Sequence, residues 1–274
     1  MIRRSCAIAA LAAALTLTVT GAASATRIVR PQPRTSPFSH VFNDIVGSTN
    51  WSGYAVEAPS QFTSVSGSWV EPAATCSGTS TGRRHHRGGG GSQQFASFWA
   101  GIDGYSSNSV EQIGTDSDCN GSTPSYYAWY EMFPAGSVNI STSQFPVEPG
   151  DTLSASVTVN GTSFTLSISS SEGWHFSTTQ QGSGLAQSSA EVIAESPEVC
   201  SGFSCQIAQL SDFGTVNYTG ADATAGAASA PFSTFTTNSG PHEIVGLDNN
   251  GAVKMQPSGL SASGDAFSVA WEHN

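Results

Sequence analysis

Four short segments of the chain combine aromatic residues with a carboxyl or carboxamide side chain. They span residues 98–104, 110–114, 128–134 and 190–197. A carboxylate can take a proton from water and later return it to a leaving group, whereas a glutamine amide can donate hydrogen bonds to an oxyanion and does not ionise in acid. Acids inside apolar segments are costly to bury unless they are paired or hydrogen-bonded. These segments are therefore the candidate site, and the alternative is that each polar group only closes a structural hydrogen bond.

The familiar signatures of other hydrolases are absent or out of context. Residues 78–82 match Gly-x-Ser-x-Gly letter for letter, but loop-like sequence flanks them where that motif needs a strand and a helix. His242-Glu243 lacks the second histidine of a zinc-protease helix. The adjacent His85 and His86 have no neighbouring cysteine or carboxylate, and neighbours on a strand point apart. We therefore predict that the two histidines belong to a surface loop rather than to a metal site.

The candidate residues lie in segments that alternate like strands. The alternation is clearest in residues 151–159 and 164–169, which flank Asn160-Gly161, a strong hairpin signal. Residues two or four apart on a strand share a face. The pairs expected on one face are Trp99 with Asp103, Trp129 with Glu131, and Glu191 with Glu195.

Similar segments recur along the chain, and helical periodicity is nearly absent. Strands are expected at residues 64–70, 95–102, 126–133, 190–195, 213–218 and 267–272. One or two helical turns are expected at most, at residues 205–210. Many short strands in one chain of this length predict an all-β fold, a single-domain sandwich of two antiparallel sheets spanning residues 49–274, with a monomer as the default.

The first 25 residues have the pattern of a signal peptide: two arginines, an apolar run and the small residues 23–25. We therefore expect a secreted, extracellular protein. Residues 26–48 carry prolines and no sustained period, and are expected to be a leader or a linker; whether they inhibit is left open. The four cysteines after the signal are an even set that allows three disulfide pairings: Cys76, Cys119, Cys200 and Cys205. The short spacing of Cys200 and Cys205 suggests that these two pair, which leaves Cys76 to pair with Cys119.

The chain contains few charged residues, and most of those are acidic. Charged residues make up 11% of the chain, the formal net charge is −11, and Lys254 is the only lysine. This balance excludes nucleic acid as the main partner, and no apolar run after the signal is long enough to span a membrane. A surface that titrates little also indicates tolerance of acid, although an ordinary secreted β protein would have the same composition.

Six blocks together resemble the glutamic peptidases, or eqolisins, between about residues 49 and 225. They are Asn50-Trp51-Ser52-Gly53, residues 99–104, Gln112-x-Gly114, residues 128–134, residues 190–195 and Asp212-Phe213-Gly214. The resemblance implies a secreted, acid-active endopeptidase on a concanavalin A/lectin-like β-sandwich, acting on polypeptides with no metal or cofactor. It assigns Gln112 and Glu195 as the catalytic pair. The residues expected to bind substrate are Trp51, Trp99, Asp103, Trp129, Glu131 and Glu191.

Two departures from the family pattern and two other functions remain open. Val192 stands where the family commonly has tryptophan, which puts a wall of the cleft in doubt, and Glu111 directly precedes the glutamine. Paired acids on a sandwich also suit a glycoside hydrolase or a carbohydrate-binding module, for which Glu195 with Glu191 or Glu131 would be the pair. A non-catalytic secreted binding protein is the other alternative. A required Gln112 amide would distinguish the peptidase.

Overall fold

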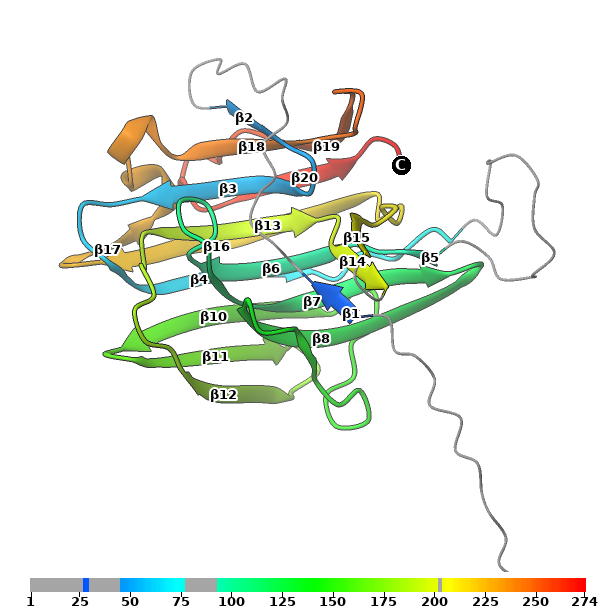
Figure 1. Cartoon of the computed structure of the whole chain (residues 1–274), viewed down its shortest axis with the longest axis horizontal. Helices are drawn as coiled ribbons and strands as arrows, with labels where there is room; N and C mark the ends of the chain where they lie inside the picture. The colour runs from blue at the N-terminus through cyan, green and yellow to red at the C-terminus, as the bar shows by residue number, and fades with distance from the viewer. Residues whose placement is uncertain (1–26, 30–44, 77–92, 202–203) are drawn as a thin grey trace, which may run out of the picture.

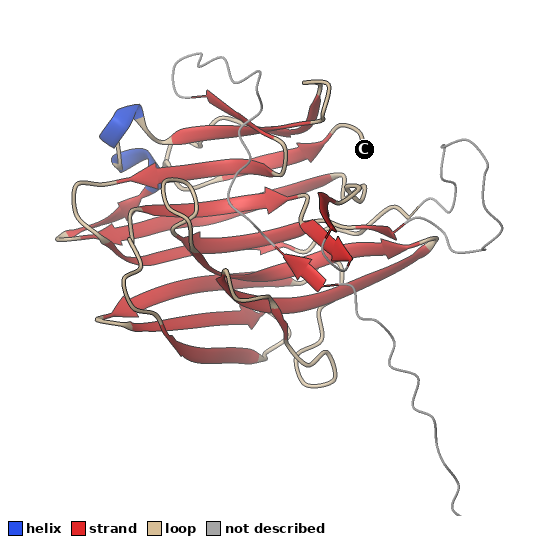
Figure 2. Cartoon of the chain, viewed as in Figure 1, coloured by secondary structure: helices blue, strands red, loops and turns tan. Residues whose placement is uncertain are grey.

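A computed structural model of the chain describes residues 27–29, 45–76, 93–201 and 204–274 (Figure 1). The predicted signal peptide, the Gly-x-Ser-x-Gly match and the histidine pair lie outside the described residues. Strands make up almost all the regular structure (Figure 2), and the described helices are two short 3-10 turns, η1 (Phe232–Thr234) and η2 (Thr237–Ser239). In the part of the chain described, no helix has the length and apolar character needed to cross a membrane. The all-β prediction is confirmed.

One layer of the sandwich, here called the site sheet, carries the candidate residues. Its strands in spatial order are β18 (His242–Leu247), β3 (Trp51–Glu57), β13 (Ser189–Glu195), β6 (Ser97–Ile102), β7 (Val110–Asn120) and β8 (Thr123–Phe133). These strands pair antiparallel. At its margins, β9 (Val138–Asn139) pairs with β8, β5 (Gln93–Gln94) pairs with β7, and β2 (Ile45–Ser48) pairs with β18 in parallel.

The second layer packs against the site sheet and supports it. Its strands in order are β12 (His175–Gln181), β11 (Ser163–Ser170), β10 (Thr152–Asn160), β4 (Phe62–Val70), β16 (Thr215–Ala225) and β20 (Phe267–Trp271). A further strand, β17 (Ala228–Pro231), pairs with β16. The strand β19 (Val253–Pro257) pairs with both β20 and β18, so the hydrogen bonding continues from one layer to the other (Figure 1).

The alternation of side chains decides which face of each strand enters the core. Along β13, Ala190, Val192 and Ala194 belong to the core between the layers, while Ile193 belongs to a second apolar cluster on the opposite face. The Asn160-Gly161 turn joins β10 and β11 as predicted, with residue 161 at φ 63°. The period-two pattern therefore sends alternate residues of the site sheet away from the core.

Several predictions from the sequence need revision. Residues 204–207 form the strand β15 (Ser204–Ile207) rather than a helical turn, because they pair with β14 (Glu198–Ser201) in a hairpin closed by the Cys200–Cys205 disulfide. The second disulfide is Cys76–Cys119, so the suggested pairing is confirmed. The sheets are not purely antiparallel, because β2 is parallel to β18. Within residues 26–48, β1 (Arg27–Val29) pairs with β14, and β2 belongs to the site sheet.

A buried carboxyl lies between the two layers at Glu71. Its oxygens accept hydrogen bonds from the hydroxyls of Thr115 and Ser117, at 2.5 and 2.7 Å, and from the indole N–H of Trp69 at 3.2 Å. Burial outweighs these hydrogen bonds and raises the pKa of Glu71 to about 8. The carboxyl is therefore protonated in acid, where it costs the core no buried charge.

We predict that the free energy of unfolding falls as the pH rises from about 4.5 towards 8, because the unfolded chain releases the Glu71 proton that the folded chain retains. The contribution of this one group is on the order of 5 kcal/mol. Glu71→Gln should flatten that pH dependence in urea titrations, whereas Glu172→Gln, at an exposed position, should leave it unchanged. An equally steep dependence in both variants would contradict this account.

Candidate active site

The strand register places most of the predicted site residues on one face of the site sheet. Glu191 lies across from Gly101, Gly101 lies across from Gln112, and Gln112 lies across from Glu131. Glu195 lies four residues further along β13, across from Ser97. The side chains of Gln112, Glu131, Glu191 and Glu195 are all fully buried. Three strands, β13, β7 and β8, thus bring one amide and three acids into a single apolar patch.

The amide of Gln112 has a fixed orientation. Its Nε2 donates a 2.8 Å hydrogen bond to Oε2 of Glu131, the neighbour in register on β8. A carboxamide NH₂ has two protons, so the second N–H remains for another acceptor. Glu131 therefore acts as the group that aims the amide.

The indole of Trp99 extends between Gln112 and Glu195. At one end, its Nε1 donates a 2.9 Å hydrogen bond to Oε2 of Glu195. At the other end, its Cζ3 lies beside Gly101, where a methyl group would be 3.0 Å from Cζ3 and 3.1 Å from Cβ of Gln112. The Glu195 carboxyl thus meets one end of the ring, and the Gln112 side chain begins near the other end, although the two residues come from strands far apart in sequence.

Tryptophan rings build the apolar wall around this pair. The rings of Trp51 and Trp99 meet edge to face, with centroids 4.8 Å apart. Trp129 and Ile193 belong to the same cluster. The three tryptophans predicted to bind substrate are therefore brought together, on the face that also carries the amide and the acids.

The two glutamates of β13 have different electrostatic surroundings. Burial raises the pKa of Glu191 well above its ordinary value, and the charges of Asp103 and Glu111 raise it further. Burial and Asp103 likewise raise the pKa of Glu111 to about 9. Glu195 instead accepts the Trp99 N–H and lies within the field of the Lys254 ammonium, and both favour its ionised form. In acid, Glu191 is neutral while Glu195 has the stabilising partners of a carboxylate.

Asp103 is not where the strand alternation predicts. It follows the end of β6 in a left-handed conformation, with φ 68°, so it does not continue the face that carries Trp99. Its carboxylate accepts the backbone N–H groups of Gln187 and Ser188, each at 2.8 Å. In this structure Asp103 holds the loop that leads into β13.

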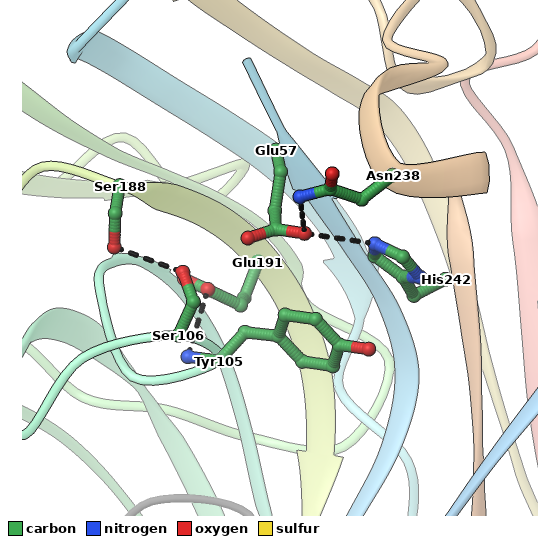
Figure 3. Close-up of polar contacts among 7 residues, drawn as sticks. All are labelled: Glu57, Tyr105, Ser106, Ser188, Glu191, Asn238 and His242. Carbon is green, nitrogen blue, oxygen red and sulfur yellow. Dashed lines mark hydrogen bonds and ion pairs between the residues drawn. The ribbon is translucent and has the colours of Figure 1, made fainter. Parts of the chain in front are cut away.

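Polar contacts fasten one end of the site (Figure 3). The backbone N–H of Tyr105 donates to Glu191 at 3.3 Å, and the Tyr105 ring stacks on His242 with centroids 4.7 Å apart. Nε2 of His242 lies 3.2 Å from Oε2 of Glu57, which also accepts the Asn238 amide at 2.8 Å. This arrangement could not be predicted from local sequence patterns, because its members come from five separate segments.

The substitution at Val192 does not alter the site face. Val192 points into the core between the layers, where its methyl carbons lie against Gly67 of β4. The sequence left open whether Val192 removes a wall of the cleft. In the structure residue 192 faces the core, and residues 191 and 193 take the other face of the strand. Residue 192 instead contributes to packing between the sheets.

The close approach at Gly101 gives a prediction. Gly101→Ala places a methyl group too near Trp99 and Gln112, so we expect a loss of about 1–3 kcal/mol from overpacking. The melting temperature should fall by roughly 2–10 °C. Gly259→Ala is the control, because a methyl group there meets no atom within 4 Å. Equal melting temperatures for the two variants would show that the ring and amide are not packed this tightly.

Comparison with known proteins identifies the kind of enzyme to which this site belongs. A model of the Peptidase A4 family matches residues 49–266, a longer span than the sequence blocks cover. Aspergillopepsin-2 of Aspergillus niger is 31% identical over 239 residues, which cover 82% of this chain and 78% of that protein. The crystal structure of aspergilloglutamic peptidase from Aspergillus niger superposes with a TM-score of 0.54 at 26% identity, covering 65% of this chain and 99% of that chain.

These matches confirm the resemblance to glutamic peptidases and the predicted β-sandwich. They also confirm the predicted enzyme class, a glutamic-type endopeptidase, over the glycoside hydrolase alternative. The chain belongs to the Peptidase A4 family.

Proposed function

We propose that the chain is a secreted endopeptidase that hydrolyses polypeptides in acid with Gln112 and Glu195 as its catalytic pair. The observation that carries this proposal is the Trp99 indole, which borders Gln112 at one end and donates to Glu195 at the other. Export is supported by the signal-like first 25 residues and by the two disulfides, which form in oxidising compartments.

The proposed reaction moves one proton in a cycle. The Glu195 carboxylate removes a proton from water as the water oxygen bonds to the scissile carbonyl carbon. The free N–H of Gln112 donates to the oxyanion that forms, while Glu131 keeps the amide turned towards it. The protonated Glu195 then gives its proton to the leaving nitrogen, the C–N bond breaks, and the carboxylate is regenerated.

Electrostatics favour Glu195 over Glu191 as the base. A general base must be ionised at the working pH, and burial together with Asp103 and Glu111 keeps the pKa of Glu191 high. Glu195 has a donor and a nearby positive charge instead. Glu191 lies directly across Gly101 from Gln112, so a neutral carboxyl there adds no negative charge next to the oxyanion position.

The same acids support the proposed activity in acid rather than at neutral pH. As the pH rises towards the raised pKa values of Glu191 and Glu111, ionisation adds negative charge beside the developing oxyanion. Ionisation of Glu71 weakens the core over the same range. We therefore expect activity to decline as the pH rises through neutrality.

Three variants test the catalytic pair against acid-unfolded protein as substrate. Gln112→Ala removes an oxyanion donor and should lower kcat by about 10²–10³-fold. Glu195→Gln removes the base and should lower kcat by about 10²–10⁴-fold. Glu191→Gln keeps the neutral form of that residue and should retain activity within about tenfold, an order-of-magnitude expectation.

Glu172→Gln, on an exposed turn, is the control for the acid-to-amide change, and circular dichroism checks the fold of each variant. Activity that survives in Glu195→Gln and is lost in Glu191→Gln would transfer the role of base to Glu191. Activity confined to neutral pH would contradict the proposal as a whole.

We also propose that residues 26–48 restrain the enzyme until they are cut. Gln112 and Glu195 are fully buried. The two described parts of this segment pair with β14, which follows β13 in sequence, and with β18, which neighbours β3 in the site sheet. Insertion of a specific protease site between residues 30 and 44 should give a protein that gains at least tenfold activity on cleavage, an order-of-magnitude expectation. Unchanged activity after complete cleavage would identify the segment as a linker.

A further inference from the structure

The described part of the chain contains one fixed positive side chain in its sandwich. Lys254 is the only lysine or arginine in residues 45–76, 93–201 and 204–274, whereas every acidic residue except Asp44 lies in those ranges. The Lys254 side chain is nevertheless buried, with 6% of its surface exposed. A lysine is almost never buried without a partner or a function, so the position of this single cation requires an explanation.

Lys254 lies close to the strand end that carries Glu195. It belongs to β19, which links the two sheets, and it lines a cavity of about 260 Å³ together with Thr49 and Ala208. Ser196, the residue after Glu195, donates its hydroxyl to the carbonyl oxygen of Ala208 at 2.8 Å. The backbone N–H of Ser196 donates to Asn50 at 2.7 Å. Ala208, which lines the cavity, is therefore hydrogen-bonded to the residue that directly follows β13.

The Lys254 charge acts on two carboxylates. It interacts electrostatically with Asp248 and with Glu195. Asp248 is already occupied, because it accepts the backbone N–H groups of Asn250 and Ala252, each at 2.8 Å. Burial lowers the pKa of Lys254 to about 8, so the ammonium stays charged throughout the acid range.

The titratable neighbours of Glu195 on the site face are acids. Along the site face, Glu191 precedes it on β13, and Asp116 lies beyond Ser97 in register on β7. Asp116 accepts the hydroxyl of Tyr127 on β8 at 2.8 Å. On the cavity side, the charged groups include Lys254, Asp248 and His273, which interacts with Asp248. Glu272 is also close in the chain, because its backbone N–H donates to the carbonyl oxygen of Lys254 at 3.0 Å. The acids disfavour a carboxylate at Glu195, and Lys254 is the fixed charge that opposes them.

We propose that Lys254 is a positioning residue that holds Glu195 in its ionised form in acid, and so extends the enzyme's activity to low pH. This inference rests on the proposed role of Glu195 as the base. It predicts that neutralising Lys254 moves the acid limb, the rise of kcat with pH on the acidic side of the pH profile, to higher pH. A nearby opposite charge lowers the pKa of a carboxyl by about one unit, so its removal corresponds to a roughly tenfold loss of kcat on the acid limb and little loss above it.

The test compares kcat from pH 2 to 7 for the wild type and for Lys254→Met, Lys254→Arg and Gln256→Met, about one measurement per half unit of pH. The substrate is a fluorogenic peptide without acidic residues, so that its own titration does not enter. Lys254→Met should shift the acid limb upward, Lys254→Arg should restore it, and Gln256→Met, two residues along the same strand, should match the wild type. Melting temperatures at each pH separate loss of fold from loss of charge.

An acid limb that does not move in Lys254→Met, or a loss of kcat by the same factor at every pH, would overturn the inference. Failure of Lys254→Arg to restore the limb would also overturn it, because the charge would then not be the cause. The proposed function fails in a different way: the wild type would lack acid activity, or Glu195→Gln would retain it.

Discussion

The register of β13, β6, β7 and β8 is the constraint on which the site depends. In a strand, a slip of one residue sends every side chain to the opposite face. The correct register is favoured because Val192, Phe98, Ile113 and Ala128 all enter the core together. Glycine 114 allows the close approach of β6 and β7, since a methyl group there would lie 2.2 Å from the carbonyl oxygen of Phe98. Packing between the layers thus positions the amide and the acids on the other face.

The buried acids of the protein fall into two groups with different electrostatic surroundings. Glu71, Glu111 and Glu191 have raised pKa values, chiefly because burial disfavours the charged form. Glu195 is equally buried, but it has an N–H donor and a positive charge nearby. In acid, the first group adds no charge to the core and the second can act as a base. A chain with so few basic residues can keep this arrangement only where protons neutralise the remaining carboxyls.

The sequence predicts the fold more completely than the details of the site. Strict alternation and Asn160-Gly161 predicted β10 and β11 almost to the residue, because local sterics decide both features. The alternation does not predict the left-handed turn at Asp103, which takes this residue off the strand. The helical turn expected at residues 205–210 is also wrong, because a disulfide-closed hairpin overrides the local pattern there. Comparison of Val192 with the family's usual tryptophan does not show where this side chain points. The structure shows that it packs in the core between the layers. Lys254 was visible as a lone lysine, but its proximity to Glu195 arises from pairing between strands distant in sequence.

The most direct test of the central claim is a crystal structure at acid pH with a phosphinic peptide bound, because its tetrahedral phosphorus mimics the hydrated peptide bond. The account predicts that one phosphinic oxygen lies about 3 Å from Nε2 of Gln112 and the other about 3 Å from the Glu195 carboxyl, with Trp99 between them. A complex in which the second oxygen meets Glu191, or in which the inhibitor contacts neither residue, would contradict it.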